Sequence, residues 1–157
     1  AELVEALRPE HAGPLPVGPK VAILQASARA PGTSTSQSIA EHLSARVAEH
    51  GCEARIVPAT DFVRDPTTVA AAARRLAEAD VLVLASPLYV SMLPYLAMRA
   101  LSETARLRQA AGAPPQRIFG VVNCGFPEPE HTRYAFAILR EYARATGAIY
   151  AGGLSVG

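Results

Sequence analysis

From residue 20 onward, short hydrophobic runs alternate with segments in which apolar residues recur at helical spacing. The runs are typical of buried β-strands, and they lie at residues 21–26, 54–57, 81–85, 118–122 and 148–154. The helical segments begin near residues 36, 66, 94 and 129. Because strands and helices alternate, the pattern predicts a doubly wound α/β domain: a five-stranded parallel sheet between two layers of helices.

Local signals support these element boundaries. Residues 81–85 read VLVLA without polar alternation, as expected for a central parallel strand covered on both faces. Asp65 and Pro66 supply an N-cap and a first-turn proline, while Gly51 and Gly147 follow helical segments as stop signals. The signals therefore agree with the hydrophobic pattern about where elements begin and end.

The expected last helix is missing from the pattern. A sheet of this type needs a helix after its fifth strand to cover one face, yet no helical segment follows residue 154. Three explanations stay open: a truncated chain, a partner that covers the face, or a different strand count.

Residues 1–19 form an N-terminal extension or linker in this interpretation. Residues 1–8 can make two turns of helix, but the prolines and glycines between residues 9 and 19 interrupt any regular element. The expected domain organisation is an extension at 1–19 followed by one domain at 20–157.

Composition narrows the class of protein. A chain of 157 residues is one domain by size, half of its residues are apolar, and its formal net charge is +1. This balance argues against a disordered chain and against a strongly basic nucleic-acid binder. Only two cysteines are present, too few for a secreted disulfide framework, so we expect a reducing, cytoplasmic compartment.

No membrane or targeting segment is expected. Residues 1–19 lack the apolar core of a signal peptide. Residues 81–98 carry no charge, but Pro87 and Pro94 interrupt them and their first part is the predicted central strand.

Candidate chemistry begins in the loop at residues 27–36, directly after the first strand. This loop carries five hydroxyl side chains and Arg29 immediately before a helix, where free N–H groups and the helix dipole attract anions. The residues that follow are not those of a Walker A loop, and Gly32 alone is not a dinucleotide fingerprint. The alternative is simple capping of the helix, which needs one hydroxyl and not a run. The loop therefore favours a phosphate site.

Residues 26–36 and residues 86–94 form two motifs, which contain ASAR with STS and SPLYVSMLP, respectively. These motifs resemble those of the NAD(P)H-dependent FMN reductase and quinone reductase branch of the flavodoxin-like superfamily. Members typically read GSPR and then [NS]TS at the start of the first helix; residues 26–29 here read ASAR and residues 34–36 read STS. After the third strand, members read SPVYWGSMP, and residues 86–94 read SPLYVSMLP, without the Trp and the Gly. The resemblance covers residues 20–157 in the expected order and implies a flavodoxin-like fold that binds FMN.

The resemblance and the residue chemistry together define a candidate FMN site. Pro87, Leu88 and Tyr89 are expected to form a wall for the isoalloxazine ring, and residues 123–126 a second wall. The alternative for Tyr89 is an ordinary half-buried aromatic. The full candidate set is Ser27, Arg29, Ser34, Thr35, Ser36, Pro87, Leu88, Tyr89, Val90, Ser91, Asn123, Cys124, Gly125 and Phe126.

Cys124 and His131 are two further candidates for a role in catalysis. Cys124 is interpreted as a structural thiol, and a disulfide with Cys52 is not expected because the two lie at different parts of the sheet. His131 either contacts a nicotinamide or quinone substrate or is a solvated first-turn residue. No catalytic side chain is assigned, since FMN carries the chemistry, and no cluster has metal-ligand spacing.

The leading hypothesis is an FMN-dependent oxidoreductase that passes electrons from NADPH or NADH to a quinone, a flavin or a similar small acceptor. The alternatives are a flavodoxin-type electron carrier, which the charge of +1 disfavours, and an FMN-binding module without turnover. We expect small-molecule substrates, no nucleic-acid or membrane partner, and a homodimer or higher homo-oligomer, since related reductases commonly pair. The sequence leaves the acceptor and the choice between NADH and NADPH open.

Overall fold

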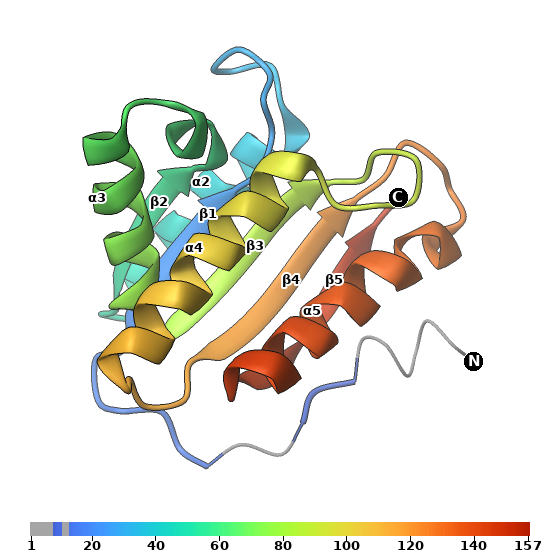
Figure 1. Cartoon of the computed structure of the whole chain (residues 1–157). Coiled ribbons are helices and arrows are strands. Elements are labelled where there is room, and N and C mark those ends of the chain that lie inside the picture. The colour runs from blue at the N-terminus through green and yellow to red at the C-terminus, as the bar shows by residue number, and fades with distance from the viewer. Residues whose placement is uncertain (1–7, 11–12) are drawn as a thin grey trace.

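The computed structural model describes residues 8–10 and 13–157, and it has a parallel sheet of five strands in the order β2-β1-β3-β4-β5. The strands are β1 (Lys20–Gln25), β2 (Glu53–Pro58), β3 (Val81–Pro87), β4 (Arg117–Asn123) and β5 (Ile149–Val156). The helices are α2 (Thr35–Glu49), α3 (Pro66–Ala77), α4 (Tyr95–Ala111) and α5 (Arg133–Thr146), with short 3-10 turns η1 (Ala59–Val63) and η2 (Pro129–Thr132). The doubly wound parallel sheet predicted from the sequence is confirmed (Figure 1).

Most predicted boundaries are accurate to one or two residues, and one prediction needs correction. The segment predicted as a single helix from residue 129 begins instead as the 3-10 turn η2, and α5 starts only at Arg133. Two prolines, Pro127 and Pro129, restrict the backbone of this segment, so the regular helix starts after them. The predicted helix at residues 1–8 lies almost entirely outside the described residues.

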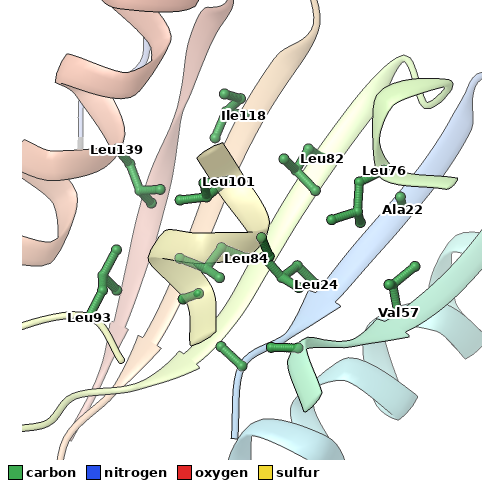
Figure 2. Packing of buried hydrophobic residues seen from close by; sticks show 14 of the residues in the cluster. Ala22, Leu24, Val57, Leu76, Leu82, Leu84, Leu93, Leu101, Ile118 and Leu139 are labelled. Carbon is green, nitrogen blue, oxygen red and sulfur yellow. The ribbon is translucent and has the colours of Figure 1, made fainter. Parts of the chain in front are cut away.

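The two faces of the sheet carry different helices. Figure 1 shows α3, α4 and α5 on one face and α2 behind the sheet. The larger apolar cluster fills the first of these faces, where Leu24, Leu84 and Ile118 are fully buried against side chains such as Leu76 and Leu101 (Figure 2). On the second face Ile23, Val83 and Val121 pack against α2.

Helix α2 covers only part of its face of the sheet. In the described part of the chain, α2 is the helix packed on this face, and Leu154 of β5 remains 53% exposed there. This is the face for which the sequence pattern lacked a covering helix.

The described part of the N-terminal extension runs along the β5 edge. The backbone N–H of Glu10 donates to the carbonyl of Tyr150 at 2.8 Å, and the Arg117 guanidinium donates to the carbonyl of Gly13. The extension therefore pairs with backbone groups that an edge strand otherwise presents to solvent.

Among the described residues, no helix is both long and apolar enough to cross a membrane. Residues 81–98 instead divide into β3, a turn and the start of α4.

Candidate ligand-binding site

A cavity of about 390 Å³ opens at the carboxyl edge of the sheet, where the loops after β1, β3 and β4 meet. In an open parallel sheet, this crevice is where ligands bind. The lining residues come from all three loops and from the end of β5: they are Ser27, Arg29, Ser34, Thr35, Ser36, Pro87, Leu88, Tyr89, Asn123, Cys124, Gly125, Val156 and Gly157. Eleven of the fourteen residues predicted for the site are among them.

The loop after β1 folds back onto the first turn of α2. Gly32, in a left-handed conformation at φ +81°, donates its N–H to the side chain of Gln37 at 2.8 Å. Ser34 is the N-cap of α2, and its hydroxyl accepts a hydrogen bond from the N–H of Gln37. The loop therefore holds its hydroxyl groups around the start of the helix.

This loop makes one end of the cavity suitable for an anion. Helix α2 has no acidic residue in its first turn, and the lining contains Arg29 but no Asp or Glu. The helix N-terminus and the guanidinium both favour negative charge. Capping occupies Ser34, but Ser27, Thr35 and Ser36 also line the cavity, so capping alone does not account for the hydroxyl run.

The loop after β3 forms an apolar wall that ends in a tight turn. Pro87, Leu88 and Tyr89 line the cavity. The backbones of Tyr89 and Met92 exchange two hydrogen bonds, at 2.9 and 3.0 Å, around a two-residue turn. The turn residues Val90 and Ser91 have φ values of +49° and +62°. Neither lines the cavity, although both were predicted to contact the cofactor.

The loop after β4 connects the other two loops. The Asn123 side chain accepts a hydrogen bond from Ser36 Oγ at 2.7 Å, and its backbone carbonyl accepts one from the N–H of Leu88 at 2.9 Å. Gly125 lines the cavity, and a Cβ there would meet nothing within 4 Å. The loop thus presents an amide side chain and open backbone to the cavity.

Two further residues of the prediction, Phe126 and His131, also lie outside the cavity lining. The rings of Phe126 and His131 are 5.1 Å apart between centroids, and both side chains are exposed. The Cys124 thiol lines the cavity and donates to the carbonyl of Phe126 at 3.2 Å, whereas Cys52 is a free thiol that precedes β2 at the far edge of the sheet.

Sequence reasoning missed two lining residues, Val156 and Gly157. The N–H of Cys124 donates to the carbonyl of Val156 at 2.9 Å, which brings the end of β5 to the cavity. The rule that parallel strands end at a common edge could have found them, had it been applied to β5 as well.

Comparisons with known proteins agree with this architecture. The family described as NADPH-dependent FMN reductase matches residues 19–101, more than half of the chain. No functionally curated protein matches the chain by sequence.

Similar solved structures include an NADH:FMN oxidoreductase in its apo form, with a TM-score of 0.68 and 17% identity over 88% of this chain and 75% of that chain. An NADPH-quinone reductase from P. pentosaceus has a TM-score of 0.60 and 16% identity over 87% of this chain and 83% of that chain. A flavodoxin, WrbA-like protein from Agrobacterium tumefaciens has a TM-score of 0.62 and 15% identity over 87% of this chain and 75% of that chain. At such identities the likeness concerns the fold, and it confirms the flavodoxin-like architecture expected from the sequence.

Proposed function

Because the chain belongs to the NADPH-dependent FMN reductase family, we propose that its cavity binds FMN and that the protein transfers electrons from NADPH or NADH to a quinone, a flavin or a similar small acceptor. The chain is an FMN-dependent oxidoreductase by family. Bound FMN supplies the ring that accepts and donates the electrons. The protein's own residues bind the cofactor, orient it and limit the access of water.

The phosphate end of FMN fits the loop after β1. Ser27, Ser34 and Thr35 offer hydroxyl groups, and Arg29 offers a guanidinium whose hydrogen bonds to a phosphate are charge-assisted. The first turn of α2 adds backbone N–H groups that have no partner within a helix. A dianionic phosphate therefore meets several donors and no Asp or Glu side chain in the lining.

The ring end fits the loops after β3 and β4. An isoalloxazine ring has apolar faces and a polar edge, so its site needs an apolar wall and nearby donors. Pro87, Leu88 and Tyr89 supply the wall, and Asn123 with the backbone at Gly125 supplies polar groups. The observation that carries the proposal is that the anion-binding loop and this wall line one cavity of about 390 Å³, within the size range of small-molecule sites.

The reduction of bound FMN is tested with the purified protein under nitrogen. We expect FMN to bind, its visible absorbance to bleach when NADPH or NADH is added, and the absorbance to return when a soluble quinone follows. Failure to bind FMN contradicts the cofactor assignment. Binding without bleaching contradicts the reductase and favours an electron carrier or a module without turnover.

We also propose that two copies of the chain pair. Large apolar side chains are exposed around the mouth of the cavity and at the start of α4: Tyr89 44%, Met92 51%, Tyr95 69% and Phe126 61%. Exposed apolar clusters of this kind commonly mark interfaces. Sedimentation equilibrium tests this, and a monomer at micromolar concentration contradicts it.

The domain organisation and location complete the proposal. Residues 20–157 would form the FMN-binding domain, with residues 1–19 as an extension that in part follows β5. The free thiols of Cys52 and Cys124 favour a reducing compartment, for which we propose the cytoplasm. Limited proteolysis that removes residues 1–19 and leaves an FMN-binding fragment supports the domain boundary.

A further inference from the structure

Ser36 and Asn123 form a hydrogen-bonded pair inside the cavity, although they are 87 positions apart in the chain. Ser36 Oγ donates to Asn123 Oδ1 at 2.7 Å, and the Ser36 side chain is only 1% exposed. The pair joins the first turn of α2 to the end of β4.

This contact gives Ser36 a different role from the other hydroxyl residues of the loop, because its donor is already used. A serine has one O–H donor, and Ser36 uses it on Asn123. The hydroxyl of Ser34 accepts from Gln37 N–H, and that of Ser27 accepts from Arg29 N–H, so both keep their donors. Thr35 also lines the cavity. Donors for a phosphate thus remain at Ser27, Ser34 and Thr35, but not at Ser36.

Asn123 lies where the three loops meet. Its side chain is bound to the loop after β1, while its backbone carbonyl accepts from Leu88 in the apolar wall. Because Oδ1 faces Ser36, the two N–H donors of Nδ2 face elsewhere, and no described residue accepts from them. An amide donor beside the apolar wall suits the carbonyl oxygens and ring nitrogens along the polar edge of a flavin.

We propose that Asn123 donates from Nδ2 to the flavin portion that FMN and riboflavin share, and that Ser36 is a positioning residue that fixes the Asn123 carboxamide. This inference rests on the proposed binding of FMN and changes the role of one residue in it. Ser36 belongs to the hydroxyl run, yet it acts on the ring end of the ligand through Asn123 and not on the phosphate.

The experiment compares affinities for FMN and riboflavin, which differ only by the phosphate. Ser36→Ala should weaken the binding of both ligands by a similar factor, about fivefold, as expected for the loss of one neutral hydrogen bond. Thr35→Ala is the matched control from the next position. Thr35→Ala should weaken the binding of FMN by about tenfold, because a hydrogen bond to the charged phosphate is lost, and should leave the affinity for riboflavin unchanged.

A double-mutant cycle separates positioning from direct contact. Asn123→Ala alone should weaken both ligands, and adding Ser36→Ala to it should have no further effect, because Ser36 then has nothing to position. Circular dichroism establishes that each variant is folded.

Two results overturn the inference while leaving the proposed function intact: a Ser36→Ala effect confined to FMN, or one that persists in the Asn123→Ala background. Failure of the unaltered protein to bind either ligand is a different outcome. It removes the proposed FMN site itself, and the inference with it.

Discussion

Gly153 of β5 packs directly against the ring of Phe136 in α5, where a Cβ atom would stand 2.4 Å from Phe136 Cε1. Gly120 of β4 is similarly close to α5, since a Cβ there would lie 2.6 Å from Leu139 Cδ1. Both Phe136 and Leu139 are fully buried. Two glycines on adjacent strands therefore let α5 approach the sheet closely.

The first prediction follows from this close packing. Gly153→Ala should lower the free energy of unfolding by about 2 kcal/mol, because the buried Phe136 ring has to move to admit the methyl group. Urea denaturation measures the change. Gly13→Ala is the control, since a Cβ at Gly13 meets nothing within 4 Å. Equal stability of the two variants would contradict the packing argument.

The turn at Val90 predicts a stabilising substitution. A β-branched residue at φ +49° is strained, and Val90 is 97% exposed, so its side chain gains little from packing. Val90→Gly should raise the free energy of unfolding by about 1 kcal/mol because glycine adopts this conformation without a Cβ clash. Val90→Ala keeps the unfavourable φ and should give a smaller gain. Chemical denaturation of both variants tests the prediction, and a larger gain from alanine would count against it.

The N-cap of α3 predicts a pH-dependent contribution to stability. The pKa of Asp65 is held below its ordinary value, chiefly by a hydrogen bond from the Thr68 hydroxyl and also by the N–H groups of Thr68 and Thr67. A carboxylate with a lowered folded-state pKa stabilises the fold above its unfolded-state pKa of about 3.9 and loses that contribution as the pH falls through the lowered value.

The test compares the unaltered chain with Asp65→Asn, which keeps a capping side chain but cannot ionise. The difference in urea midpoint between the two proteins should be largest near neutral pH and should shrink below pH 4 or so. All other carboxylates are common to both proteins, so the difference isolates Asp65. A difference in urea midpoint that stays constant down to acid pH would show that the charge of Asp65 is unimportant for the cap.

The position of Arg29 predicts that its contribution to FMN affinity depends on salt concentration. Its exposed guanidinium lines the proposed phosphate end, so Arg29→Gln should weaken FMN by about tenfold at low ionic strength. The difference in FMN affinity between the variant and the unaltered protein should narrow as salt screens the attraction between Arg29 and the phosphate. Riboflavin affinity should not change. Fluorescence titrations at several salt concentrations measure this. Arg46→Gln, at the far end of α2 and paired with Glu49, is a matched control for net charge.

The sequence alone determined the class of fold and the edge of the sheet at which the site lies. Alternating apolar runs and helical segments require a parallel sheet, because each crossover between parallel strands needs a helix, and the motifs at residues 26–36 and 86–94 follow two of those strands. Eight predicted residues of these two motifs line the cavity, and three more, Asn123, Cys124 and Gly125, line it at the end of β4 and in the loop that follows.

Only the tertiary structure decided what each residue of the site can do. The distance between Ser36 and Asn123 depends on how β1, β3 and β4 lie side by side, and no local pattern records that a particular hydroxyl uses its donor on a residue 87 positions away. The same holds for Val90, since only the structure shows that its turn has a positive φ and leaves its side chain 97% exposed and outside the cavity lining. Periodicity reports the environment that each residue needs, whereas hydrogen-bond partners are set by contacts between distant segments.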